Sequence, residues 1–573
     1  MPRSSRKLSS AAVACLTLAA TAIHAGQTLD QTKDTGLSPF GVGACNQTSQ
    51  AWNKWIPQMA AIGVAEARTL RSGWGDVEPE EGRWNWNTLD RQLKDAASNR
   101  MDFTALLAWE APWNTKDKPG SFPLNNISAW STYCSEVVKH LKGKVKYFEV
   151  WNEPPNFCND APASDYAKIV VATYNAAKAA NPDCQVGMAT KSVHVNYLEQ
   201  AIKSGAKDHF DYITVHPYEV LACATTGGES VYMHIVPTIR KMLTAQNPSK
   251  VNVPIWFTEL GTTIGREGTA EEQGQMLVKA YTMGIAQGVA CIQWFEGMDG
   301  DSGPMGMLES DGKPRPAYNA MAQTIKHLGK FPSYVGWVML NNKDYGFVFN
   351  GAMGTVLATW AQPKTSDDLA FGQSVEIVDP LTGTVSKADK YSLTNAPIFV
   401  LGVPPNLVAQ AKANQNKPFP WGGDYTNAQL ISLTVGEANE EKGLHTRSGA
   451  SVAADVVAYG GPARSGETPG GNVFVVDPNF LSYTATPIEI TVVVRRNAAN
   501  DNAGFKLRYE STSGFKNSEW NTVPDNKEWH TVSWKINDAQ FVNYWGYNFA
   551  LDSDGNQYNK YFIQSVTVKK LVN

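Results

Sequence analysis

The 573-residue sequence lacks several features that would place it in common functional classes. It has no CxxC spacing, which argues against a cysteine-held zinc cluster. No GxGxxG loop follows its first predicted strand, which argues against an open dinucleotide-binding sheet. Its formal net charge of −4 gives no surplus of the positive charge that nucleic acid attracts. After residue 25 no run is apolar enough to cross a membrane. We therefore expect a globular protein with neither nucleic acid nor membrane as partner.

Residues 1–25 have the pattern of a secretory leader. Arg3, Arg6 and Lys7 give a basic start, residues 11–23 are apolar, and residues 23–25 suit a signal peptidase. The apolar stretch is too short for a stable membrane anchor. We predict a signal peptide at 1–25 and a secreted or periplasmic protein. Without the leader's three cations the net charge is about −7.

Cysteine is scarce, with seven residues in the whole chain. One of them, Cys15, lies in the leader. An even number of the rest, in an exported protein, indicates disulfide bonds, although spacing leaves the connectivity open. We prefer a bond between Cys158 and Cys223, because both fall in loops after predicted strands. The six candidates are Cys45, Cys134, Cys158, Cys184, Cys223 and Cys291.

A chain of this length is too long for one core and predicts several domains. From residue 38 to 330, short apolar segments alternate with amphipathic ones. Eight strands with intervening helices in about 290 residues predict an α/β fold. They favour a (β/α)8 TIM barrel rather than a doubly wound sheet. The strand candidates are Phe40–Gly43, Ala65–Arg71, Phe103–Ala108, Lys146–Trp151, Gln185–Ala189, Asp211–His216, Pro254–Thr258 and Ala290–Phe295. The helix candidates are Trp52–Ile62, Leu89–Ala97, Trp130–Leu141, Asp165–Ala180, Val231–Ala245, Ala270–Ala286 and Pro316–Leu328.

The pattern changes near residue 331, where short β-rich runs without helical period follow one another. They predict a small antiparallel β-sandwich at 331–410, with residues 27–37 as a candidate addition. Pro404-Pro405 and the Pro- and Gly-rich residues 417–423 indicate a linker at 411–424. Regularly spaced strands predict a C-terminal β-sandwich, jelly-roll-like, at 425–573. Its tryptophans are either core or a carbohydrate-binding surface, and the sequence leaves both open: Trp520, Trp529, Trp534 and Trp545.

One short stretch carries the clearest chemical signal. In residues 147–154 a predicted strand ends in Asn152-Glu153, and Pro154 then stops it. The pattern recurs at residues 254–261, where Glu259 ends another strand. Parallel barrel strands present their C-terminal ends at one face, so strands four and seven place these carboxylates on opposite sides of the mouth. Two opposed carboxylates, one a protonated acid with a raised pKa and one ionised, are what glycosidic-bond cleavage needs.

Other polar and aromatic side chains at predicted strand ends converge on the same face. We predict substrate contacts for Asn152, His216, Tyr218, Trp294, Arg68, Trp109, Glu110 and Glu296. Arg71 is the alternative to Arg68 on strand two, and an ion pair between Arg68 and Glu259 is expected. Glu110, Glu296 and Asp299 stay open between substrate contact and rim charge, and His216 between site contact and structural role. Trp151 is expected to pack beneath the site, and Asp76 and Glu78 to be structural.

The motifs at strands four and seven, Trp151-Asn152-Glu153-Pro154 and Phe257-Thr258-Glu259, resemble those of the clan A glycoside hydrolases. Residues 74–82 resemble the strand-two region of families 39 and 5, and His216-Pro217-Tyr218 their strand-six motif. Family 39 is nearest, with residues 316–320 opening the last helix, and the resemblance covers residues 38 to about 400.

The resemblance implies Glu153 as acid/base, Glu259 as nucleophile and Trp294 as the floor of the sugar subsite. It implies a retaining hydrolase of poly- or oligosaccharides that needs no cofactor and no metal. A catalytically inactive polysaccharide-binding protein and a transglycosylase are the alternatives. The sugar, the linkage, endo or exo action and the oligomeric state are not readable from the sequence.

Overall fold

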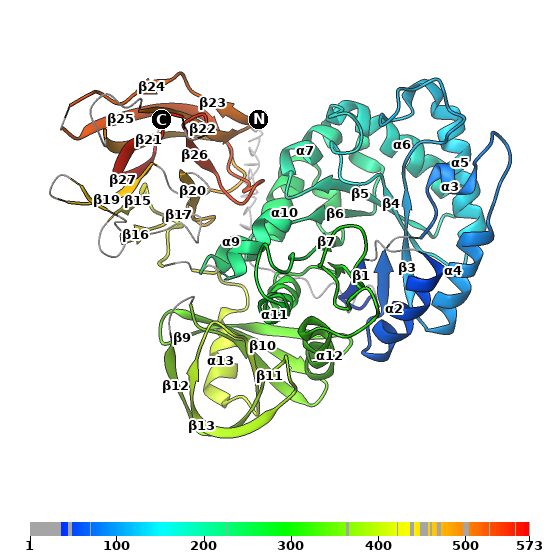
Figure 1. Cartoon of the computed structure of the whole chain (residues 1–573), viewed down its shortest axis with the longest axis horizontal. Helices are drawn as coiled ribbons and strands as arrows, with labels where there is room; N and C mark the ends of the chain where they lie inside the picture. The colour runs from blue at the N-terminus through cyan, green and yellow to red at the C-terminus, as the bar shows by residue number, and fades with distance from the viewer. Residues whose placement is uncertain are drawn as a thin grey trace, which may run out of the picture.

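The computed structural model describes residues 36–573 apart from 44–47, 69, 226, 363–365, 421, 436–439, 447–455, 459–460, 467–471, 497–502, 527, 556 and 572–573. The predicted signal peptide, residues 27–35 and Cys45 lie outside the described residues. Figure 1 shows three parts: a barrel ringed by helices, a β-sheet layer below it, and a C-terminal β-domain beside α7 and α10. Among the described helices, none combines the length and the apolar character that crossing a bilayer takes.

Eight parallel strands close into a barrel in chain order, because β1 pairs with β8 as well as with β2. This confirms the predicted (β/α)8 fold. Both faces of these strands are covered, and six of them are apolar over most of their length, as buried parallel strands are. The strands are β1 (Phe40–Gly43), β2 (Glu66–Arg68), β3 (Asp102–Leu107), β4 (Tyr147–Val150), β5 (Gln185–Lys191), β6 (Tyr212–His216), β7 (Ile255–Leu260) and β8 (Cys291–Phe295).

Most helices around the barrel bury an apolar face, and α9 and α11 are buried over nearly their whole length. A capping box, in which the Thr269 and Glu272 side chains bond each other's backbone N–H, starts α11 at the predicted residue. The predicted helix at 231–245 is two helices that meet at His234. The helices are α2 (Ser49–Ala61), α3 (Trp74–Val77), α4 (Asn87–Ser98), α5 (Ile127–Leu141), α6 (Ala163–Ala180), α7 (Val195–Lys203), α8 (Tyr218–Leu221), α9 (Glu229–Met233), α10 (Ile235–Gln246), α11 (Ala270–Ala286) and α12 (Pro316–Leu328).

The second part is a six-stranded antiparallel sheet with the order β13-β12-β14-β11-β10-β9. It packs on the barrel through α12 and α11, and Lys279 of α11 donates to Asn395 Oδ1 at 2.6 Å. Its strands are β9 (Ser333–Leu340), β10 (Asp344–Gly351), β11 (Gly354–Thr359), β12 (Asp367–Val378), β13 (Val385–Leu393) and β14 (Ile398–Leu401).

The expectation that residues 331–424 contain no helix is wrong. Pro404 and Pro405, read as linker signals, begin helix α13 (Pro405–Asn414). Proline suits the first turn of a helix, because the N–H that it lacks has no intrahelical partner there. The helix lies on β9, where Asn414 Nδ2 donates to the Trp337 carbonyl at 3.2 Å. Residues 405–414 thus form a helix that packs on the six-stranded sheet and belongs to the second part of the molecule.

The C-terminal part is an antiparallel β-domain whose strands enclose a second apolar core. It bonds to the barrel helices: Asn196 of α7 donates to the Ser511 carbonyl at 2.8 Å, and Tyr483 donates to Glu199 at 3.0 Å. Its strands are β15 (Leu430–Thr434), β16 (Glu440–Lys442), β17 (Leu444–Thr446), β18 (Val456–Ala458), β19 (Gly461–Ser465), β20 (Asn472–Val476), β21 (Thr486–Arg496), β22 (Gly504–Ser511), β23 (Gly514–Asn517), β24 (Asn521–Thr522), β25 (His530–Ala539), β26 (Phe549–Asp552) and β27 (Tyr561–Lys570).

The preferred Cys158–Cys223 disulfide is not formed, and that prediction is wrong. Cys158 is a buried free thiol whose Sγ donates to the Pro155 carbonyl at 3.0 Å. Cys134, Cys184 and Cys291 are also buried free thiols. Burial raises the pKa of Cys134 and Cys291, so these thiols stay protonated and unreactive. Within the described part of the chain, cysteine acts as a small apolar residue.

Gly336 of β9 allows α13 to lie close to the sheet. A Cβ at this position would come 1.8 Å from the Ala411 carbonyl oxygen of the helix. We expect Gly336→Ala to lower the free energy of unfolding by about 3 kcal/mol, because helix and sheet must separate. Gly354→Ala is the matched control, since it also has a positive φ but nothing within 4 Å of its Cβ. Calorimetric melting should show a clearly larger loss for Gly336→Ala; equal losses would rule out the close contact as the cause.

Candidate active site

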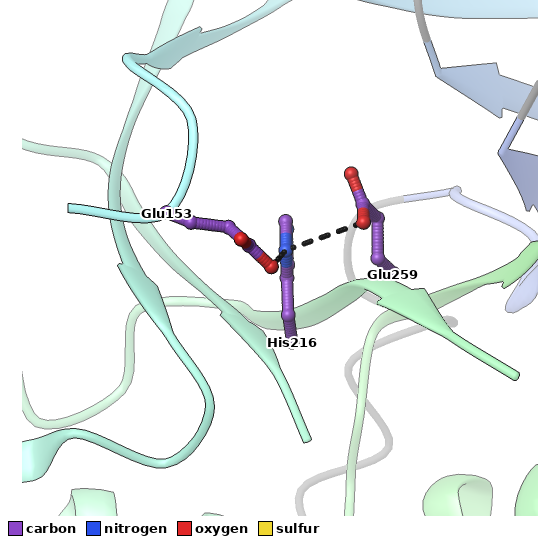
Figure 2. Close-up of side chains that lie close together, drawn as sticks. All are labelled: Glu153, His216 and Glu259. Atoms are coloured by element: carbon purple, nitrogen blue, oxygen red, sulfur yellow. Dashed lines mark hydrogen bonds and ion pairs between the residues drawn. The ribbon is translucent and has the colours of Figure 1, made fainter. Parts of the chain in front are cut away.

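The C-terminal ends of the barrel strands bring the predicted carboxylates together. Glu153 follows β4 and Glu259 lies at the end of β7, each partly exposed at the mouth. His216, the last residue of β6, has a side chain that is only 1% exposed. Figure 2 shows its ring between the two carboxylates. An oxygen of each glutamate and a ring nitrogen of His216 all lie within 4.8 Å of one another. The fold therefore brings together Glu153, His216 and Glu259, which the sequence predicted to lie at one face of the barrel.

Arg68 of β2 connects this group to the barrel interior. Its Nε and Nη2 donate to Glu149 at 3.0 and 3.2 Å, which is a two-point pairing of guanidinium and carboxylate. Its Nη2 also donates to Asn152 Oδ1 at 2.7 Å, and its Nη1 to Glu259 Oε1. The expected Arg68–Glu259 ion pair is therefore present. One buried cation fixes the Asn152 amide and one of the two mouth carboxylates.

Glu149 was not among the predicted site residues. It is fully buried on β4 and also accepts from Thr214 at 3.1 Å and from Thr258 at 3.4 Å. The signal for it was present in the sequence, because a lone acid in an otherwise apolar strand requires a buried partner. Its carboxylate supplies the negative charge that lets Arg68 remain in the barrel interior.

His216 bonds on both sides of its ring. Nδ1 lies 2.7 Å from Glu153 Oε1 and 3.5 Å from Glu259 Oε2, and Nε2 lies 3.0 Å from Thr258 Oγ1. A protonated ring would donate at both nitrogens. The structure thus places His216 between the two carboxylates, and its burial makes the predicted substrate contact wrong.

The pKa values of His216 and Glu153 are shifted in opposite directions. Burial by itself disfavours a charged His216, but the carboxylates of Glu259 and Glu153 outweigh it and raise the pKa of His216 above its usual value. Burial also favours a neutral Glu153, but the hydrogen bond and charge of His216 outweigh it and lower the pKa of Glu153 to about 2. We expected a raised pKa for the acid, and the difference comes from the imidazole at 2.7 Å. The pair titrates as a unit.

Tyr218 and the end of β8 complete the opposite wall. The Tyr218 hydroxyl donates to Glu259 Oε2 at 3.2 Å. Phe295 is half-buried, and its ring centroid lies 6.3 Å from that of Tyr218. The neighbouring Trp294 is fully buried in the core and offers no surface to a substrate. The prediction that Trp294 floors a sugar subsite is therefore wrong. Consecutive strand residues point to opposite faces, and Phe295 is the one that is partly exposed.

Trp109, after β3, is an exposed aromatic at the mouth, 38% exposed, and its ring lies 5.7 Å from that of Phe157. Phe157, in the loop after β4, is 57% exposed and was not predicted. A large aromatic residue four positions after the strand-end Glu153 would have been its signal. Trp151 is buried beneath this pair, as expected. Glu110 is exposed, and its Oε2 accepts from the Gly120 N–H at 2.6 Å.

Several polar candidates lie outside the site. Glu296 is fully buried and accepts from the Gly300 N–H at 3.1 Å, so its predicted substrate contact is wrong. Asp299 is bonded to Arg315 by two contacts of 2.6 Å and is structural. Arg71, the alternative to Arg68, is a half-exposed residue that pairs with Asp76 at 3.4 Å. Glu78 accepts from the Trp74 indole at 2.7 Å and is structural, as expected.

Glu153, His216 and Glu259 offer three ligand atoms, enough in number to hold a divalent cation. Each of these atoms already has a partner in the site, since His216 lies against Glu153 and the Arg68 guanidinium against Glu259. A second positive charge beside Arg68 is electrostatically unfavourable. The arrangement therefore suits a proton shared by the two carboxylates and the imidazole.

No protein-family model matches the sequence, and neither does any curated protein. Solved structures do match. A family 39 glycoside hydrolase from the gut symbiont Bacteroides cellulosilyticus WH2 is 17% identical, with a TM-score of 0.53 over 65% of this chain and 82% of that one. This barrel has the fold of a glycoside hydrolase.

Two further matches are more distant. The exo-β-1,4-mannosidase Op5Man5 from Opitutaceae bacterium strain TAV5 is 16% identical, with a TM-score of 0.41 over 51% of this chain and 60% of that one. Xylanase 10B from Thermotoga maritima is 17% identical, with a TM-score of 0.38 over 52% and 97%. At these values the matches carry no further argument. The resemblance to family 39 is thus one of fold.

The shared proton gives a prediction about pH. His216→Asn removes the imidazole that holds the proton next to Glu153. The alkaline limb of the kcat/KM profile should then move to lower pH by about one unit, because Glu153 alone holds the proton less strongly than the pair does. His140→Asn is the control, since His140 pairs with Asp90 on the outside of the barrel. An alkaline limb that stays in place in the His216 variant would mean that the pair does not control the proton.

Proposed function

We propose that this protein is a retaining glycoside hydrolase that cleaves poly- or oligosaccharides. The observation that carries the proposal is the pair Glu153 and Glu259, which face one another across the barrel mouth with oxygens within 4.8 Å. Retaining enzymes hold their two carboxyl groups about 5 Å apart, whereas inverting enzymes leave about 6.5 Å or more for a water molecule. The separation therefore favours retention.

In the first step a carboxylate oxygen of Glu259 attacks the anomeric carbon while the bond from that carbon to the leaving oxygen breaks. Arg68 and Tyr218 donate to this carboxylate and hold it in position for the attack. Glu153 gives its proton to the leaving oxygen. The product of this step is a glycosyl ester on Glu259 together with the free leaving group.

In the second step Glu153 takes a proton from water, and the resulting hydroxide displaces Glu259 from the anomeric carbon. Two inversions give net retention, and both carboxyl groups return to their starting states. Asn152, held by Arg68 at 2.7 Å, is placed to contact the sugar 2-hydroxyl. These residues carry out hydrolysis with water as the only co-reactant.

His216 keeps the proton that the first step consumes. In the free enzyme this proton lies on the imidazole, 2.7 Å from Glu153 Oε1. A bound sugar displaces water from the mouth, which disfavours the charged pair, so the proton moves from Nδ1 to Glu153. We also propose that the enzyme is exported, on the basis of the leader-like residues 1–25.

A transglycosylase would use the same residues and differ only in its acceptor, and an inactive binding protein would not need both carboxylates. A panel of chromogenic glycosides and of plant, algal and bacterial polysaccharides tests the proposal. Proton NMR of the first products then reports the anomeric configuration, and retention is expected. Inversion, or no cleavage of any substrate, would overturn it. Product size with and without added acceptor sugars separates hydrolysis from transfer.

Glu259→Gln should lower kcat by about a thousandfold or more, because an amide oxygen is a poor nucleophile. The variant should still fold, since Arg68 keeps the carboxylate of Glu149. Glu267→Gln is the control, a partly exposed glutamate in the loop that follows β7. Circular dichroism and melting check the fold, and turnover on the best substrate checks the chemistry. A folded Glu259→Gln variant with ordinary turnover would exclude Glu259 as nucleophile.

A further inference from the structure

A loop of the C-terminal domain, residues 540–548, lies against the barrel next to β5. Ser192, which follows β5, donates its hydroxyl to the Tyr544 carbonyl. The ring of His194 stacks on that of Tyr544, with a centroid distance of 3.9 Å. Figure 1 shows the C-terminal domain beside α7, the helix that begins directly after these residues. The two domains therefore meet at the rim of the barrel mouth, next to the strand that carries Glu153.

Glu510 holds this loop in one conformation. Its carboxylate is fully buried on β22 and accepts the backbone N–H groups of Val542, Asn543 and Tyr544 at 2.9, 3.0 and 2.6 Å. It also accepts from Asn548 Nδ2 at 2.9 Å. A buried carboxylate with this many donors orders the backbone around it. The loop is thus a preformed surface rather than a loose connection.

From this loop a chain of contacts leads to Glu153. Lys191, the last residue of β5, lies with its Nζ 5.4 Å from the centroid of the Trp545 ring. The same Nζ donates to Asn156 Oδ1 at 2.8 Å, and Asn156 Nδ2 donates to Glu153 Oε2 at 3.4 Å. The pKa of Tyr544 is raised mainly by burial. The negative charges of Glu219, Asp160 and Glu153 raise it further. These acids follow β4 and β6, so Tyr544 also lies near the mouth.

We propose that Trp545 and its loop form the wall of the subsite that binds a sugar leaving group. The inference rests on the proposed function, because Glu153 protonates the leaving oxygen and the groups beyond Glu153 then face the leaving group. Trp545 is half-buried, and the Nζ of Lys191 lies over one face of its ring. An aromatic face with an adjacent cation suits the apolar face and the hydroxyls of a sugar ring. The substrate is therefore an oligo- or polysaccharide, not a glycoside of a small alcohol.

The other candidate tryptophans of the domain contact their own domain. The Trp520 ring packs on Tyr558 at 5.1 Å, and the Trp534 ring on Phe505 at 6.1 Å. Trp529 lies under the guanidinium of Arg495 at 5.9 Å. Of these four, only Trp545 has a described ring contact with a barrel residue. Trp545 is thus the tryptophan of this set through which the C-terminal domain contacts the barrel.

The experiment compares two substrates of one sugar with the full-length chain: a glycosyl fluoride, whose leaving group is a single atom, and the hexasaccharide. The sugar is glucose, xylose or mannose, whichever the wild type cleaves. Trp545→Ala should lower the ratio of kcat/KM for the hexasaccharide to kcat/KM for the fluoride by about tenfold, because only the hexasaccharide reaches the wall. Trp545→Tyr should restore most of this ratio. A ratio does not depend on the fraction of folded protein.

Trp529→Ala is the matched control, a half-buried tryptophan of the same domain that also lies beside a cation. Its ratio of kcat/KM for the hexasaccharide to kcat/KM for the fluoride should equal that of the wild type. A ratio that Trp545→Ala leaves unchanged would overturn the proposal, and so would an equal fall in the Trp529 variant.

A binding measurement separates this inference from the proposed function. Calorimetry with the β-1,4-linked hexasaccharides of glucose, xylose and mannose compares Glu259→Gln with Glu259→Gln/Trp545→Ala. The Kd should weaken about tenfold in the double variant, whether or not the wild type turns over. If no glycoside is cleaved but binding depends on Trp545, the proposed hydrolase function fails, whereas the proposal that Trp545 lines a sugar subsite stands. If no hexasaccharide binds, or if the Kd is the same with and without Trp545, the proposal that Trp545 lines a sugar subsite is overturned.

Discussion

The site depends on one buried ionic interaction, the two-point pairing of Arg68 with Glu149 inside the barrel. A lone guanidinium in a barrel interior would be too costly, so Glu149 must accompany it. Once the pair is formed, the remaining donors of Arg68 point to the mouth and fix Asn152 and Glu259. The position of the nucleophile-type carboxylate is thus set by a charge that lies beneath it. Because the pair is buried, solvent and salt screen it only weakly.

The same charges explain why a proton stays at the mouth. The carboxylates of Glu153 and Glu259 lie 2.7 and 3.5 Å from His216 Nδ1, so negative charge is in excess around the ring. That excess raises the pKa of His216 against the effect of burial, and the charged ring in turn keeps Glu153 ionised. His216 and Glu153 therefore titrate as one pair, joined by the 2.7 Å contact between Nδ1 and Oε1.

The extra domains differ in how they relate to this chemistry. The six-stranded sheet packs on the helices α11 and α12 of the barrel, and none of the site residues described above belongs to it. The C-terminal domain contributes the loop with Tyr544 and Trp545, ordered by Glu510 and docked beside β5. Its contact with Lys191 reaches Glu153 through one asparagine. An appended domain can thus shape the substrate site when its loop is rigid before the substrate arrives.

The sequence by itself determined the barrel, because eight short strands, most of them apolar, and the periodic helices between them are local patterns. It also identified Glu153 and Glu259 as strand-end acids. It did not determine which side of a strand faces the site, so Trp294 was chosen where Phe295 lies at the mouth. Only the tertiary structure decided the partners of Arg68 and the place of Trp545. These contacts join residues far apart in the chain, and packing, which no local pattern encodes, brings them together.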